Sequence, residues 1–105
     1  MDDPIATHAR ALAALGHEAR LTVFRALVRA GEDGLNVGEI AALTGLPAST
    51  LAHHLRALVT AGLVTQTKRG RAVVNRVDFP AANRTADFLL AECCTAAGLA
   101  RDDAA

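Results

Sequence analysis

The hydrophobic pattern of this chain changes its period twice, and this change limits the folds that the chain can adopt. Up to about residue 61, apolar residues recur every three or four positions, as on one face of an α-helix. Residues 63–77 instead alternate and are rich in β-branched side chains, and the helical spacing returns from Phe79 onward. The sequence therefore predicts a mainly α-helical fold with one small β-hairpin.

Glycine and proline residues divide the helical part into separate helices. Pro4 suits a first helical position, and both Gly16 and the segment GEDG at 31–34 interrupt the pattern. Gly45 and Pro47 permit a tight turn between a third and a fourth helix. We predict helices at 4–14, 17–30, 37–43 and 47–61, hairpin strands at 63–67 and 72–77 around the turn KRGR, and a last helix at 79–94.

Length and composition limit the class of protein. The 105 residues fit one domain, and 51% of them are hydrophobic, so a core can form without disulfides or a structural metal. The chain has no signal-peptide pattern and no run of about 18 apolar residues. We expect a cytoplasmic protein that does not interact with membranes, in which both cysteines are reduced thiols. No nucleophile–base set, glycine-rich phosphate loop or carboxylate pair indicates an enzyme.

The charge distribution carries more information than the net charge, which is zero. Between Ile40 and Val77 there is no carboxylate, and the five cations in this stretch are Arg56, Lys68, Arg69, Arg71 and Arg76. A local cationic stretch of this kind is typical of phosphate binding, although a solvated charged surface would have the same composition.

Two helices joined by a short turn and followed by a basic hairpin predict a winged helix-turn-helix. We interpret residues 1–105 as one such domain, with the helix-turn-helix at about 36–61 and the wing at 63–77. In this fold the second helix of the pair enters the major groove of DNA, and the wing can hold adjacent phosphates or the minor groove.

Two stretches carry a family resemblance, ALAALGHEARLTVFRAL and VGEIAALTGLPASTLAHHLRALVTAGLVTQTKRGRAVVNRV. Over roughly residues 10–94 the chain resembles the ArsR/SmtB family of bacterial metalloregulatory repressors. The resemblance implies a homodimer formed by the first and last helices, here 1–14 and 79–97. It also implies an inverted-repeat operator, DNA binding without a cofactor, and an inducer that weakens the DNA complex.

Carried onto this chain, the family's recognition helix spans Pro47 to Ala61. The side chains predicted to bind DNA are Ser49, Thr50, His53 and His54 in this helix and Lys68, Arg69 and Arg71 in the wing. The two histidines are adjacent and therefore about 100° apart around the helix. We expect one of them to face DNA and the other to bond to the scaffold or to a phosphate. At Ala48 a Gln is common in the family and at Ala52 a Ser, so direct readout of bases is reduced here.

Two family sensor sites are missing from the sequence. The stretch LNVGEI, where one type of member has a Cys-x-Cys, has no cysteine. The last helix offers Asp87 and Glu92 but no histidine for a zinc site. The remaining candidates are Cys93 and Cys94, the only two cysteines in the chain. On the predicted helix Cys93 falls on the apolar stripe, where it could simply pack, and Cys94 is rotated away from that stripe.

Adjacent thiols suit chelation better than a structural disulfide. Neighbouring Cα atoms are about 3.8 Å apart, whereas disulfides usually need about 4.4–6.8 Å. We therefore predict that the pair binds trivalent arsenic or antimonite. Some arsenic-responsive members add a third cysteine downstream, but TAAGLARDDAA has none, so methylarsenite is favoured over arsenite as inducer. The alternative is a thiol-based redox or sulfide-responsive repressor that uses the same pair.

Overall fold

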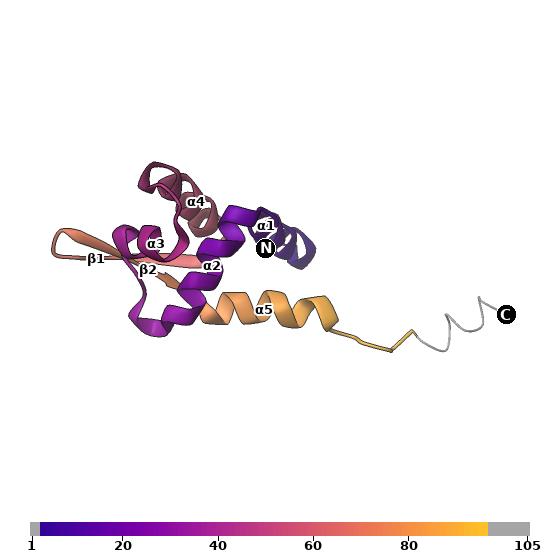
Figure 1. Cartoon of the computed structure of the whole chain (residues 1–105). Helices are drawn as coiled ribbons and strands as arrows, with labels where there is room; N and C mark the ends of the chain where they lie inside the picture. The colour runs from indigo at the N-terminus through magenta and orange to yellow at the C-terminus, as the bar shows by residue number, and fades with distance from the viewer. Residues whose placement is uncertain (1–2, 97–105) are drawn as a thin grey trace.

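The computed structural model describes residues 3–96. In chain order its elements are α1 (Pro4–Leu15), α2 (Glu18–Ala30), the 3-10 turn η1 (Gly31–Asp33), α3 (Val37–Thr44), α4 (Ala48–Thr60), β1 (Val64–Arg69), β2 (Ala72–Val77) and α5 (Phe79–Leu90). The two strands pair antiparallel as a hairpin, and Figure 1 shows the hairpin and α5 extending from the helical body in opposite directions. The predicted mainly α-helical winged helix-turn-helix is confirmed. No helix in the described part of the chain is long and apolar enough to cross a membrane.

Four of the five α-helices, all except α4, begin where a local side chain accepts a hydrogen bond from a free backbone N–H group. Asp3 caps α1, with Pro4 following, and Asp78 caps α5 through a 3.1 Å bond to the N–H of Ala81. At α3, Asn36 and Glu39 form a capping box, with reciprocal bonds of 2.8 and 2.9 Å. These caps explain why the predicted helix starts lie within one residue of the observed ones.

The core lies where α2, α3 and α4 meet. Leu51, Leu55 and Leu58 of α4 are buried in one cluster with the apolar side chains of the other two helices, which include Leu27 of α2 and Ile40 of α3. Since these leucines are spaced four and three positions apart, they occupy one face of α4. The opposite face of α4 is therefore left to solvent.

His54 lies on the buried face of α4, which corrects its prediction as a DNA-contacting residue. Its side chain is only 8% exposed, its ring centroid lies 5.1 Å from that of His17, and its buried Nδ1 has no hydrogen-bond partner among residues 3–96. Burial lowers the pKa of His54, and the positive charges of His17, His53 and Arg20 lower it further. His54 is therefore held in its neutral form.

The wing is fixed to the helical body by Asn75, a fully buried polar residue of β2. Its backbone exchanges bonds of 2.8 and 2.9 Å with Leu35, its side-chain amide donates to the Leu35 carbonyl at 3.1 Å, and its Oδ1 accepts from Gln66 at 2.8 Å. Gly34 lies directly against this contact with a φ of +67°, and a Cβ at that position would lie 2.5 Å from the Asn75 carbonyl oxygen. Only glycine satisfies both the backbone angle and the close approach.

The hairpin turn is tighter than predicted. Lys68 and Arg69 belong to β1 and pair with Val73 and Ala72, so only Gly70 and Arg71 remain in the turn. Gly70 adopts a φ of +61°, which allows a two-residue connection between the strands. The basic side chains are therefore presented from strand ends and a short turn, not from a four-residue loop.

The last helix ends at Leu90, which corrects the prediction that it continues through Cys94. Beyond Leu90 the chain forms turns, and Glu92 and Cys94 have φ values of 64° and 72°. Leu89 and Leu90 are 58% and 77% exposed, so the last two residues of the helix have little packing within the described chain. Cysteine and threonine have weak helix propensity, and without packing they do not extend the helix. The part of this prediction that falls on residue 97 lies outside the described residues.

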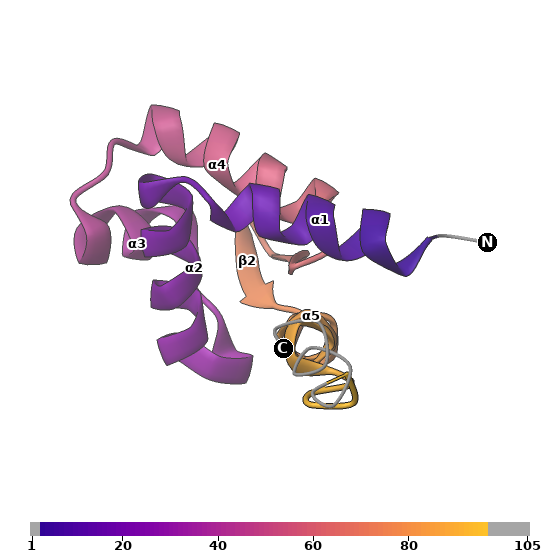
Figure 2. The same ribbon diagram turned by 90° about the vertical axis from the view of Figure 1, so that its right-hand side faces the viewer.

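Within the described chain, α5 packs mainly against α1. His8 of α1 bonds through Nδ1 to the hydroxyl of Thr85 at 2.8 Å, and its ring stacks on Phe88 with 4.3 Å between centroids. Figure 2 shows α1 running along α4, with α5 on the other side of α1. The first helix therefore lies between the last helix and the recognition helix.

The close approach at Gly34 predicts that alanine substitution destabilises the protein more at Gly34 than at Gly31. Gly31→Ala, at a φ of +65° and a ψ of −146° but in open space, should lose about 1–3 kcal/mol of unfolding free energy from backbone strain alone. Gly34→Ala should lose about 1–3 kcal/mol more, because the new methyl group meets the backbone of Asn75. Urea unfolding followed by circular dichroism measures both values, and equal losses would contradict the described contact.

The buried neutral His54 predicts a loss of stability in mild acid. Because its pKa is lowered in the folded state, the unfolded chain binds more protons near the ordinary pKa of about 6.5. The unfolding free energy should therefore be fully present above about pH 6.5 and should fall as the pH drops below it.

His54→Leu tests this prediction by urea unfolding between pH 5.5 and 8. It should reduce the acid-dependent loss and, by removing an unsatisfied buried nitrogen, preserve or raise stability at pH 8. His53→Leu, at the neighbouring exposed position, is the matched control and should keep the acid-dependent loss. An unchanged pH dependence in His54→Leu would rule out His54 as its source.

Candidate DNA interface and thiol pair

The exposed face of α4 presents polar side chains near the start of the helix. Ser49, Thr50 and His53 are all exposed, and Ser49 and His53 lie four positions apart on the same side of the helix. The hydroxyl of Thr50 donates to the carbonyl of Pro47 at 2.9 Å, which leaves its oxygen free to accept a hydrogen bond. Hydroxyl and imidazole groups in these positions can bond to base edges.

The two adjacent histidines have different roles in the structure. The ring of His53 is exposed on the same side as Ser49, whereas the ring of His54 is buried. The two rings therefore lie in different environments, but among residues 3–96 the Nδ1 of His54 lacks the expected bond to the scaffold, and the DNA contact of His53 stays a prediction. The sequence does contain a signal for this outcome, because residue 54 falls between the core positions Leu51 and Leu58 at helical spacing.

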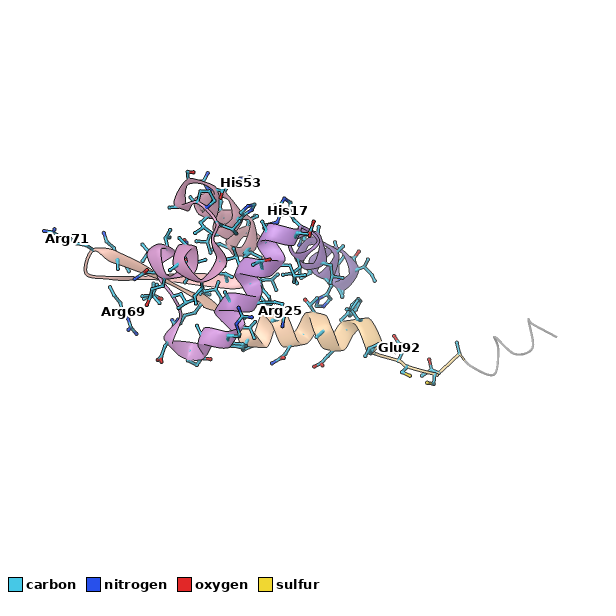
Figure 3. The ribbon with its side chains drawn as sticks, viewed as in Figure 1. His17, Arg25, His53, Arg69, Arg71 and Glu92 are labelled. Carbon is cyan, nitrogen blue, oxygen red and sulfur yellow. The ribbon has the colours of Figure 1, made fainter. Side chains whose placement is uncertain are left out.

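The three predicted basic residues of the wing lie together at the end of the hairpin. Lys68, Arg69 and Arg71 are all exposed, and Figure 3 shows Arg69 and Arg71 directed outward from the tip. Arg76, lower on β2, donates instead to the hydroxyl of Thr67 at 3.2 Å. The wing tip therefore offers three cationic side chains to an anionic partner.

Cys93 and Cys94 are free thiols, and both are exposed. They lie in the turns after α5, so the interpretation of Cys93 as part of a buried apolar stripe does not hold within this chain. A hydrogen bond with the Cys94 thiol, and some desolvation, raise the pKa of Cys93. Both thiols are accessible, and a soft electrophile that binds Cys93 must displace a proton that this raised pKa helps to retain.

Within the described part of the chain, no third metal ligand accompanies the thiol pair. Across residues 3–96, no group of three or more His, Cys, Asp or Glu side chains is placed to hold a metal ion. Figure 3 shows Glu92, beside the pair, at the end of the molecule opposite Arg71 of the wing. The thiol pair and the DNA-facing residues are thus separate regions at opposite ends of the described chain.

Comparisons with known proteins agree with this architecture. The model of a family described as a helix-turn-helix domain matches residues 15–67, half of the chain. A curated protein of Halobacterium salinarum, provisionally named arsenical resistance operon repressor, is 37% identical over 68 residues. That match covers 65% of this chain and 56% of the relative, so the matched part is little more than half of that protein.

Two solved structures extend the comparison to most of the fold. An ArsR-like transcriptional regulator from Rhodococcus has a TM-score of 0.74 and 29% identity, with 95% of this chain and 89% of that chain covered. A homodimeric winged helix-turn-helix DNA-binding domain from Mycobacterium bovis has a TM-score of 0.67 and 26% identity, with 82% and 78% covered. These relatives are described as transcriptional regulators and not as enzymes. The chain therefore belongs to the helix-turn-helix family, and it is similar over most of its length to structures described as ArsR-like transcriptional regulators.

Proposed function

We propose that the protein is a homodimeric repressor that leaves its inverted-repeat operator when a trivalent arsenical binds Cys93 and Cys94. The observation that carries this proposal is the pair of adjacent, exposed, free thiols on a regulator fold. The named function of the Halobacterium relative, arsenical resistance, supports the same class of inducer. Under this proposal DNA binding requires no cofactor.

The DNA contacts of the proposed repressor divide into two groups. Ser49, Thr50 and His53 on α4 read base edges in the major groove, while Lys68, Arg69 and Arg71 in the wing hold phosphates. His54 is omitted from this set because it is buried. The first group sets sequence preference, and the second contributes affinity that is largely independent of sequence.

An uncovered apolar surface supports dimerisation. A groove of about 400 Å³ runs between α1, α2 and α5, and the larger apolar side chains that line it are Leu12, Leu15, Phe24, Val28, Leu63, Phe79 and Leu89. Three of these side chains, Leu12, Val28 and Leu89, are more than one-third exposed in the single chain. The Mycobacterium relative is homodimeric. A twofold dimer would space two recognition helices by about 34 Å, one turn of DNA.

The number of available thiolates favours a methylated arsenical. Methylarsenite, CH3As(OH)2, already has one As–C bond, so two thiols complete its three-coordinate site. Each S–H proton leaves with one hydroxide as water, two As–S bonds replace two As–O bonds, and arsenic stays trivalent. Leu90, three residues before Cys93 and 77% exposed, offers an apolar neighbour for the methyl group. Contact with Leu99 was also expected, but that residue lies outside the described chain.

The contacts of α5 suggest how arsenical binding affects DNA binding. The thiol pair follows α5, α5 packs mainly on α1, and α1 contacts α4. The bond from His8 to Thr85 and the stack of His8 on Phe88 join α1 to α5. Under the proposal, chelation restrains the turns after Leu90, shifts α5 on α1, and so changes how α4 is held in each subunit.

A redox or sulfide response is the second candidate, because it would use the same exposed pair. Peroxide would join the two sulfurs in a disulfide, with both protons leaving in two waters as the peroxide is reduced. Such a bond between neighbouring residues is strained and therefore easily reduced. Release of DNA by peroxide or by a persulfide donor, but not by arsenicals, would favour this candidate over the first.

Single serine substitutions test the role of the thiols. Cys93→Ser and Cys94→Ser should keep operator affinity but lose arsenical-induced release, because a serine oxygen does not replace a soft thiolate. The concentration of methylarsenite needed for release should rise by at least about tenfold, within the range of typical coupling. Ala91→Ser, at an exposed position in the same turn, is the matched control and should respond normally. Loss of DNA binding without inducer in either cysteine variant would instead indicate a structural role.

The ligand count also predicts an order of potency. Methylarsenite should release operator DNA at a lower concentration than arsenite, with one arsenic bound per chain, in a fluorescence-anisotropy titration combined with arsenic analysis. Arsenite must keep a hydroxide or take a thiolate from the other subunit. Equal or greater potency of arsenite would contradict the two-thiolate site, and one arsenic per dimer would indicate a site shared between subunits.

A further inference from the structure

We propose that the groove between α1 and α4 binds the sugar-phosphate backbone of DNA, as a third contact region besides the recognition helix and the wing. The groove has a volume of about 440 Å³. Its polar and charged lining consists of Arg10 from α1 and His53, Arg56 and Thr60 from α4. This inference rests on the DNA-binding role of the chain and adds a ligand site to it, but it does not depend on the inducer.

The groove continues the DNA-facing side of α4. Ser49, His53, Arg56 and Thr60 are spaced by four, three and four positions, and all four are exposed. This spacing places them in one row along the helix. His53 belongs both to the base-reading set and to the groove lining. A duplex that contacts the start of α4 is therefore directed along the row into the groove.

The chemistry of the groove suits a phosphate. Arg10 and Arg56 are exposed on its two sides, and among residues 3–96 neither guanidinium has a hydrogen-bond partner in the protein. The α1 sequence, PIATHARALAAL, contains no carboxylate that could neutralise Arg10. Most of the remaining lining residues are alanines, whose small side chains allow a backbone strand to approach. Guanidinium groups bind phosphate oxygens through two parallel hydrogen bonds.

The dimensions of DNA favour a duplex as the occupant over a small anion. The major groove is about 12 Å wide, and an α-helix with its side chains is about 10–12 Å across. A recognition helix in that groove therefore has a phosphate strand along each side. Because α1 lies along one side of α4 (Figure 2), Arg10 is placed where such a strand must pass.

The experiment compares arginine variants on two duplexes, the operator and a scrambled sequence of the same length. Arg10→Ala should lose at least about tenfold in affinity for both duplexes alike, because each subunit of the dimer loses a charged hydrogen bond worth about tenfold or more. The slope of log K against log salt should become shallower by about one for each arginine–phosphate pair that the substitution removes, so by about two for a dimer. Arg10→Lys should lose less, because it keeps the charge but not the paired hydrogen bonds.

Two further variants make the result decisive. Arg25→Ala removes an equally exposed arginine of α2 that does not line the groove, and it should match the wild type. Arg71→Ala in the wing should show the same kind of loss as Arg10→Ala. Thermal unfolding of each variant checks that the fold is retained, which is expected because Arg10 is exposed.

Three outcomes would overturn the inference. Arg10→Ala could behave like Arg25→Ala, which would leave the wing and recognition helix as sufficient contacts. Inorganic phosphate could raise the thermal midpoint in an Arg10-dependent way with no change in the DNA salt slope, which would show a site for a free anion. A wild-type protein that binds neither duplex would overturn the DNA-binding assignment together with this site.

Discussion

Burial of the leucine face of α4 is the interaction on which the functional surfaces depend. Leu51, Leu55 and Leu58 are each at most 2% exposed, and burying one leucine side chain contributes about 1.5–3 kcal/mol. A rotation of α4 by one residue, about 100°, would move these side chains out of the core and turn Ser49 and His53 away from their present direction. The core therefore determines which side chains of α4 face DNA, without any contact between those side chains themselves.

The position of the wing depends on a second constraint, the buried polar residue Asn75, which joins the hairpin to the helical part of the protein. Asn75 has no exposed surface, and a slip of the hairpin by one residue would break every bond that it makes to Leu35 or Gln66. An unpaired buried amide costs about 1–3 kcal/mol, which strongly disfavours the alternative register. As a result, Arg69 and Arg71 occupy a defined place relative to α4, as two-part DNA recognition requires.

Local patterns were sufficient to predict most elements, and tertiary contacts account for the differences. The periodicity and the Gly and Pro positions predicted every helix and the hairpin in the described chain, because these signals act within a few residues. The end of α5 was predicted too late, since the apolar spacing continues to Cys93, whereas Leu89 and Leu90 are too exposed to stabilise a longer helix. Arg10 was also missed as a candidate, because its neighbour Arg56 is 46 positions away in the sequence.

Helix α1 contacts both the core that holds α4 and the last helix α5. The energy of its contact with α5 is similar to a typical coupling energy between two sites. Ala11 and Ala14 are buried in the core cluster that holds α4, while His8 bonds to Thr85 and stacks on Phe88 of α5. A hydrogen bond contributes about 0.5–1.5 kcal/mol and an aromatic stack a similar amount. Coupling between two sites is typically about 1–3 kcal/mol. Making or breaking the contact of His8 with α5 is therefore sufficient to couple the thiol pair to the proposed DNA-binding surface. Binding of an inducer at the end of α5 thus needs no rearrangement of the leucine core. The same side of α4 can face DNA with and without the inducer.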